Sequence, residues 1–214
     1  MKNYLKKDGF ALILVFIPFV YLGLIWDALP DNVPLHWNLQ GEVDRWGSKS
    51  ELWFIPFVTT GLIYILLSVI PILDPKKRIS EMGAGYGKLK LALVGVMAVL
   101  ALALIQMTRN DEMPAPEMIL PIVGLLFIVL GSFMNRIKPN YFIGIRTPWT
   151  LESTEVWSKT HKLGGILFIV GGISIAGVGF LAETETAFKF TVFAALSIAL
   201  ISVLYSYWVY RKQP

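Results

Sequence analysis

The chain has 214 residues, of which 55% are apolar and 16% are charged, and its formal net charge is +4. With a mean hydropathy of +0.62, it is too apolar for an ordinary soluble domain of this length. It contains no cysteine, which excludes disulfides and thiolate metal sites. The composition therefore predicts an integral membrane protein.

Six apolar segments are each about the ~20 residues that a helix needs to cross a bilayer. They are residues 10–29, 52–73, 89–107, 118–134, 163–182 and 187–209. The first follows a basic N-terminus and is too long for a signal-peptide core, so it is predicted to be a retained span. The prediction is an all-α bundle of six transmembrane helices. It is divided into a two-helix unit at 1–75 and a four-helix unit at 76–214.

The orientation of the bundle is predicted from its Lys and Arg residues. Fifteen of the nineteen fall on the side that holds both termini, whereas ten of the fifteen carboxylates fall on the other side. Because basic loops stay in the cytoplasm, both termini are predicted to be cytoplasmic. The net charge of +4 then reflects inner loops that face an anionic leaflet, so binding of nucleic acid need not be invoked.

The outer passage, residues 29–49, is predicted to be extended. Apolar residues alternate strictly with polar residues or proline from Val33 to Gln40, and Gly41 offers a turn into a returning strand. We expect a short hairpin with Trp37 and Trp46 on a face toward the lipid headgroups. The other face would present candidate ligand-binding residues, namely His36, Asn38, Gln40, Glu42 and Asp44.

His36 has three interpretations. A single imidazole in a polar loop is most often a hydrogen-bonded structural residue. A metal site is a weaker interpretation, because the other histidine, His161, is predicted on the opposite side of the membrane. An outer-surface hydrolase would use His36 with Asp44 or Glu42 as acid and base. A serine triad is disfavoured because no serine stands in a GxSxG turn. No catalytic residue, metal or cofactor is therefore assigned, and a non-enzymatic role is favoured.

The inner segment, residues 135–162, is predicted to contain a helix that begins at Thr147 as N-cap and Pro148 as first residue. Trp149, Trp157 and His161 recur at helical spacing, which forms one aromatic face. The simplest interpretation is an interfacial helix anchored by two indoles. The candidate residues for binding a cytoplasmic partner are Asn140, Arg146, Trp149, Trp157 and His161.

The spans carry no ionisable residue at mid-bilayer, which disfavours ion-coupled transport. A transporter of small molecules, lipids or peptides stays open. Gly165, Gly172 and Gly179 are seven residues apart and predict close packing of the fifth span on another helix. That helix would belong either to the same chain or to a second subunit.

Two motifs resemble known families. The outer passage fits the pattern LPxxVPxHWNxxGxxDxWGSK at residues 29–49, which is similar to the signature of a bacterial membrane domain of unknown function. The inner sequence NYFIGIRTPWTL, from Asn140, with Trp157 and His161 beyond it, resembles the hallmark of the SdpI family. Both motifs, in this order on six spans, extend the resemblance over essentially the whole chain.

The resemblance implies a multi-pass protein of the bacterial cytoplasmic membrane that acts in immunity and signal transduction. The founding member of the family protects a Bacillus cell from its own secreted peptide toxin and holds a repressor at the membrane. By resemblance, the expected partners are an extracellular peptide toxin at the outer passage and a cytoplasmic transcriptional repressor at the inner segment. Membrane lipid and a second copy of the chain are further expected partners.

Overall fold

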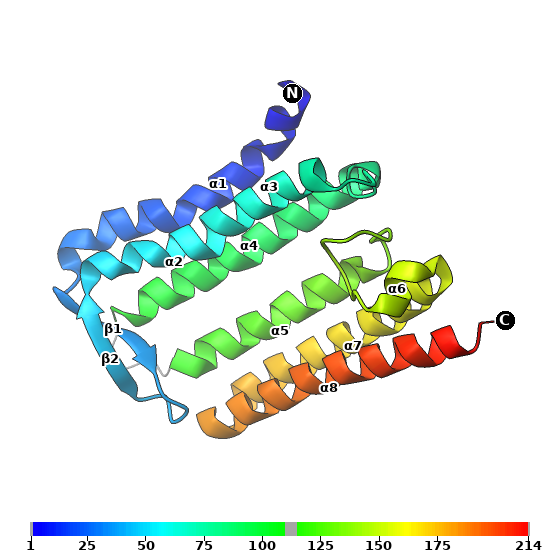
Figure 1. Cartoon of the computed structure of the whole chain (residues 1–214). Helices are drawn as coiled ribbons and strands as arrows, with labels where there is room; N and C mark the ends of the chain where they lie inside the picture. The colour runs from blue at the N-terminus through cyan, green and yellow to red at the C-terminus, as the bar shows by residue number, and fades with distance from the viewer. Residues whose placement is uncertain (1, 110–114, 214) are drawn as a thin grey trace.

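The computed structural model describes residues 2–109 and 115–213 (Figure 1). Most of the chain is helical. The long helices are α1 (Lys2–Ile25), α3 (Ile63–Leu73), α4 (Ala84–Met107), α5 (Ala115–Met134), α7 (Thr154–Leu181) and α8 (Thr184–Arg211). Short helical pieces are η1 (Trp26–Ala28), η2 (Lys49–Trp53), α2 (Phe54–Pro56), η3 (Phe57–Leu62), η4 (Ser80–Met82) and α6 (Pro148–Glu152).

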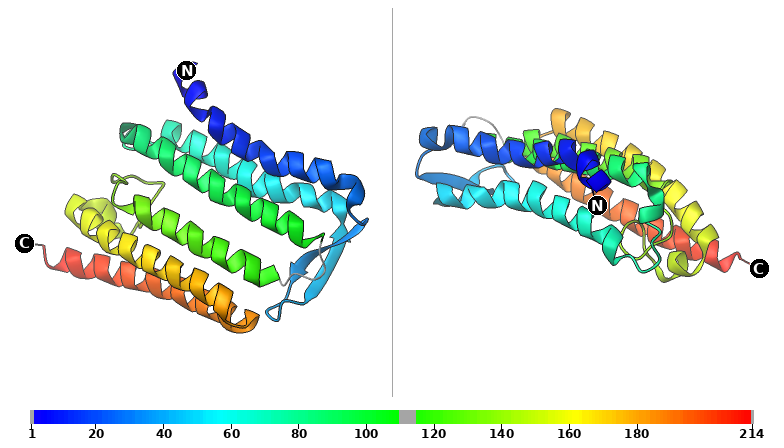
Figure 2. Two further views of the ribbon diagram at one scale, coloured as in Figure 1. Left: turned by 180° about the vertical axis from the view of Figure 1, so that it is seen from behind. Right: turned by 90° about the horizontal axis from the view of Figure 1, so that it is seen from above.

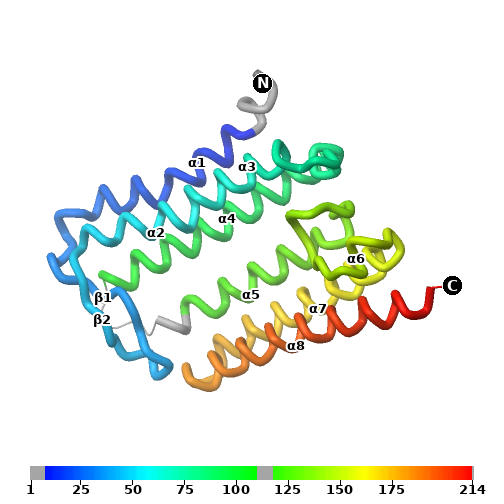
Figure 3. Tube along the Cα trace, viewed as in Figure 1, coloured from blue at the N-terminus to red at the C-terminus, as the bar shows by residue number. Residues whose placement is uncertain are grey.

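The long helices form two groups that lie side by side (Figures 1 and 2). The first contains α1, α4 and the continuous segment from η2 to α3, and the second contains α5, α7 and α8. Helices α4 and α5 join the groups. A two-stranded sheet lies at one end of the bundle, here called the sheet end. The trace in Figure 3 places α6 and the C-terminal end of α8 at the opposite end, here called the loop end.

Five helical segments are long and apolar enough to cross a membrane, and a sixth apolar helix is shorter. The five are Asp8–Ala28, Lys49–Leu73, Ala84–Met107, Thr154–Leu181 and Thr184–Arg211, and the shorter helix is Met118–Met134. A mostly helical membrane protein is therefore confirmed. The sixth crossing and the position of the termini stay predictions.

Glycine residues on both helices allow the backbones of α7 and α5 to pack in direct contact. A Cβ added to Gly172 would lie 2.5 Å from the carbonyl oxygen of Gly124, and one added to Gly131 would lie 2.7 Å from that of Gly165. Such close approach is typical of membrane helices that pack through small residues. The glycine face of the fifth predicted span therefore packs within the same chain, on α5.

The helix from η2 to α3 is held to α1 by a buried hydroxyl. Thr60 is fully buried, and its Oγ1 lies 3.0 Å from the Val15 carbonyl oxygen and 2.8 Å from that of Pro56. Between Phe57 and Leu62 the helix widens into a π turn. In a bilayer, polar groups must find hydrogen-bond partners inside the protein, and the Thr60 hydroxyl lies within hydrogen-bond distance of carbonyl oxygens on two helices.

A buried ion pair, which was not predicted from the sequence, joins α1 to α4 near the loop end. Lys90 Nζ lies 2.5 Å from Asp8 Oδ2, and the two side chains are only 8% and 21% exposed. The Tyr64 hydroxyl lies 3.5 Å from the same carboxylate oxygen, and Lys90 lies 5.0 Å from the Tyr64 ring centre. Three helices of the first group therefore meet at one ion pair.

Candidate functional site

The outer passage forms an antiparallel pair of strands, β1 (Asn32–Trp37) and β2 (Val43–Ser48). The turn between them contains Gly41, whose φ of 83° favours glycine. Asn38 Oδ1 accepts hydrogen bonds from the backbone N–H groups of Gln40 and Glu42 at 3.0 and 2.9 Å. The extended structure that alternation predicts is thus present, and Asn38 shapes its turn.

The apolar side of the sheet covers the ends of helices. Val33 is fully buried in a cluster with Leu22, Leu52 and Ile105, which come from α1, η2 and α4. Trp46 pairs across the strands with Pro34 and is 50% exposed. β1 therefore turns apolar side chains toward the protein, whereas the expectation was a shared face of Trp37 and Trp46 on the headgroups.

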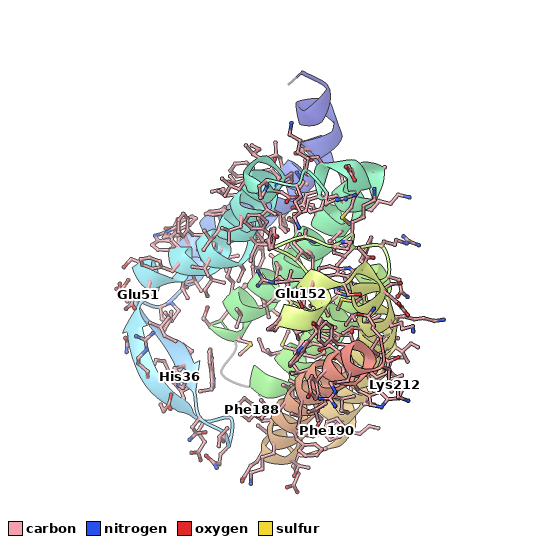
Figure 4. The ribbon with its side chains drawn as sticks, turned by 45° about the vertical axis from the view of Figure 1, so that its right-hand side comes forward. His36, Glu51, Glu152, Phe188, Phe190 and Lys212 are labelled. Atoms are coloured by element: carbon pink, nitrogen blue, oxygen red, sulfur yellow. The ribbon has the colours of Figure 1, made fainter. Side chains whose placement is uncertain are left out.

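His36 and Asp44 form an exposed pair on the sheet. His36 Nδ1 lies 2.6 Å from Asp44 Oδ1, and the side chains are 65% and 43% exposed. Figure 4 shows His36 on the pair of strands and Glu152 on α6, at the loop end. Among the described residues, no three His, Cys, Asp or Glu side chains gather as metal ligands. Water-exposed pairs of this kind add little to stability. The polar atoms of the pair are therefore available for hydrogen bonds and ionic contacts with a ligand.

The other outer candidates lie around the turn. Asn38 Nδ2 donates to Glu42 Oε2 at 3.0 Å, so these two side chains form a second exposed pair. The side chain of Gln40 reaches Glu185 at the start of α8. The turn therefore extends from the first group of helices to the second.

A cavity of about 310 Å³ lies between the sheet and the helix ends. Its walls include Leu35 and Trp37 from β1, Arg45 from β2, Phe54 from α2 and Leu104 from α4. Sequence reasoning missed it because its walls come from segments that only the folded chain brings together.

At the loop end, Asn140 holds the inner loop together. It is 2% exposed, and its Oδ1 accepts from the backbone N–H groups of Phe142 and Ile143 at 2.7 and 2.8 Å. Its Nδ2 donates to the carbonyl oxygens of Lys138 and Ile143 at 2.8 and 3.1 Å. All four contacts are within the chain, so Asn140 could meet a partner only if the loop opened.

Trp157 and His161 are also buried and engaged. The Trp157 indole donates to the Ile137 carbonyl oxygen at 2.7 Å and stacks on the imidazole of His161 at 4.0 Å. His161 Nε2 accepts from the Ile145 N–H at 3.1 Å, so the ring proton is on Nδ1, which donates to the Trp157 carbonyl oxygen at 2.8 Å. Gly144, with φ of 112°, allows this approach, since a Cβ there would lie 2.4 Å from Nε2.

The prediction that Trp149, Trp157 and His161 form an aromatic face on one helix is wrong. Thr147 is the N-cap of α6 and Pro148 its first residue, as predicted. However, α6 ends at Glu152, and Ser153 is extended and caps a separate helix, α7. Trp149 therefore packs against Tyr207 of α8 at 5.0 Å, while Trp157 lies in the core. The N-cap preference of serine overrode the four-residue spacing.

Arg146 is the exposed member of the inner candidates, and it belongs to a basic surface. Its guanidinium donates to the Tyr141 carbonyl oxygen, and Lys76 lies 4.7 Å from the Tyr141 ring centre. Lys138 and Arg78 lie 3.1 and 3.4 Å from Glu81. The hydrogen bond from Lys138 lowers the pKa of the Glu81 carboxyl. We call these four residues the basic loop surface: Lys76, Arg78, Lys138 and Arg146.

Comparison with known proteins matches both motif regions. A family model described as the SdpI/YfhL protein family matches residues 136–206, and one described as a domain of unknown function, DUF1648, matches residues 13–60. The immunity protein SdpI of Bacillus subtilis (strain 168) is 24% identical over 208 residues, which covers 97% of this chain and 98% of that protein. No solved structure matches the chain.

Proposed function

We propose that the chain is a member of the SdpI/YfhL family, a multi-pass protein of the bacterial cytoplasmic membrane that gives immunity against a secreted, membrane-active peptide. The observation that carries this proposal is the similarity to an immunity protein along nearly the whole chain, which includes both ends of the bundle. Neither end alone would indicate the role.

In this proposal the six apolar helices all cross the membrane, both termini are cytoplasmic and the sheet end is outside. The distribution of Lys and Arg supports this orientation. The basic loop surface then faces the cytoplasm, where anionic lipids attract positive charge. The sheet end faces the medium from which a secreted peptide arrives.

The sheet end is proposed to bind the peptide. The exposed His36–Asp44 pair and the neighbouring Asn38–Glu42 pair present hydrogen-bond acceptors and negative charge on the paired strands and their turn. A ligand can use them with little rearrangement, because the strands are fixed to the helix ends by Val33. Gln40 completes this set of candidate ligand-binding residues.

The loop end is proposed to hold a cytoplasmic repressor. The exposed Arg146 and the partly exposed Trp149 are the inner candidates whose side chains a partner reaches without unfolding the loop. Asn140, Trp157 and His161 would then act indirectly, because they fix the loop on which Arg146 lies. A guanidinium suits a carboxylate on such a partner.

Both halves of the proposal can be tested in cells. Sensitive cells that express the wild-type chain should survive the family's secreted peptide toxin, whereas cells with an empty vector should die. Equal killing of the two cultures would reject immunity. For signalling, a repressor encoded beside this gene should move to the membrane fraction when the peptide is added. An unchanged distribution would reject repressor binding alone.

The His36–Asp44 pair also favours one alternative, an outer-surface hydrolase. Their distance of 2.6 Å is that of an acid and base in contact. Turnover of a lipid or peptide by the purified protein, abolished in both His36→Gln and Asp44→Asn, would support the enzyme. Peptide binding without turnover would support immunity.

A further inference from the structure

The cavity at the sheet end has mainly apolar walls, and the charged Arg45 and Glu51 also line it. Its volume of about 310 Å³ is at the lower limit of pockets that hold small ligands. Leu35 and Trp37 of β1, Phe54 of α2 and Leu104 of α4 contribute apolar walls from three different elements. Because the walls converge, a single bulky apolar group would be contacted on several sides.

The charge around the cavity selects the kind of occupant. Residues 26–51 contain five carboxylates but only two basic residues, Arg45 and Lys49. Lys49 is already paired with Asp31 at 3.0 Å. The carboxylates of Glu42 and Asp44 contact uncharged or histidine partners, so their negative charge is largely uncompensated. An anionic phospholipid would be repelled from this surface, whereas a cationic peptide would be attracted to it.

We propose that the cavity receives one large apolar side chain of a cationic peptide, while basic groups of the same peptide contact Glu42 and Asp44. This inference rests on the proposed immunity function and names the chemistry of its ligand. Arg45 lines the cavity and has no carboxylate partner among the described residues. Its guanidinium would donate to carbonyl oxygens of the docked peptide.

One pair of variants distinguishes binding in the cavity from binding to the surrounding apolar surface. Phe54 lines the cavity and is 67% exposed, whereas Phe57 is 52% exposed and lies one turn further along the same helical segment, outside the cavity. Phe54→Ala and Phe57→Ala should therefore fold equally well. A second pair tests whether filling the cavity blocks binding. Leu104→Trp narrows the cavity from α4, whereas its control, Val99→Trp, adds the same ring on an exposed face of α4 outside the cavity.

The experiment measures binding of the family's secreted peptide toxin to the purified full chain in zwitterionic nanodiscs. Phe54→Ala and Leu104→Trp should each weaken binding by about tenfold or more, because each variant reduces the burial of the peptide's apolar side chain in the cavity. Phe57→Ala and Val99→Trp should bind like the wild type, and their thermal unfolding should show that all four variants are folded.

Three results would overturn the inference. If the wild type protects cells and binds the peptide, but all four variants bind equally well, the cavity is not the site although the proposed function stands. If phosphatidylglycerol vesicles displace the peptide only when Phe54 is present, a lipid occupies the cavity. If the wild type neither protects nor binds, the proposed function fails and the inference fails with it.

Discussion

The two ends of the bundle use similar polar side chains in opposite ways. At the loop end, Asn140 and His161 are buried, and their hydrogen bonds all go to this chain. At the sheet end, His36 and Asp44 are exposed and contact mainly each other. Buried polar groups must be satisfied within the protein, whereas exposed ones keep their capacity for a ligand. The motif residues at the loop end therefore hold the loop together, whereas those at the sheet end are available for the proposed recognition of a peptide.

The largest expected effect is at the buried ion pair near the loop end. Lys90→Met leaves the Asp8 carboxylate without its partner, and removing one member of a buried pair costs about 3 to 5 kcal/mol. Thermal unfolding of the purified protein measures the loss. Lys88→Met is the control, because Lys88 is exposed. Equal unfolding temperatures for both variants would show that the pair is solvated.

Gly144→Ala should destabilise the inner loop by about 2 to 4 kcal/mol. The substitution combines a positive φ of 112° with a Cβ at 2.4 Å from His161 Nε2. Gly85→Ala is the control, since a Cβ there meets nothing within 4 Å and alanine favours a helix. Limited proteolysis of the loop would show the difference, and an unaltered digestion rate for Gly144→Ala would refute this account of the turn.

Two asparagines provide a direct comparison between the ends. Both Asn140 and Asn38 accept two backbone N–H groups in a turn, but Asn140 is buried and Asn38 is half-buried beside solvent. Asn140→Ala should cost about 1 to 3 kcal/mol, because backbone groups of the loop lose four hydrogen bonds to this buried side chain. Asn38→Ala should cost less, since water replaces the side chain. Chemical unfolding of the two variants tests this order, and the reverse order would contradict it.

The smallest effect on stability is expected at the exposed pair. His36→Gln should change the free energy of unfolding by less than about 1 kcal/mol, as for other exposed ion pairs. Thermal unfolding checks this, with the exposed Asn32→Ala as control. If His36→Gln lowered the free energy of unfolding as much as Asn140→Ala, the His36–Asp44 pair would also be required for stable folding.

The sequence predicted features that depend on neighbouring residues. Hydropathy marked the long helices, alternation marked β1, and Thr147 with Pro148 marked the start of α6. It did not reveal contacts between distant segments. The Asp8–Lys90 pair joins residues 82 positions apart, and the cavity needs the sheet, α2 and α4 together. The break at Ser153 was missed because a regular four-residue spacing fits a short helix followed by a long one as well as a single helix.

The central claim is that the sheet end recognises the peptide. Its most direct test compares the protection per protein molecule of variants at the two ends of the bundle. Sensitive cells expressing the wild type, a His36→Gln/Asp44→Asn double variant or Asn140→Ala are exposed to the peptide toxin, and survival is divided by the amount of protein in the membrane. The account predicts that the double variant accumulates like the wild type but protects at least tenfold less. Asn140→Ala should accumulate less and protect normally per molecule. A double variant that protects as well as the wild type would contradict recognition at the sheet end.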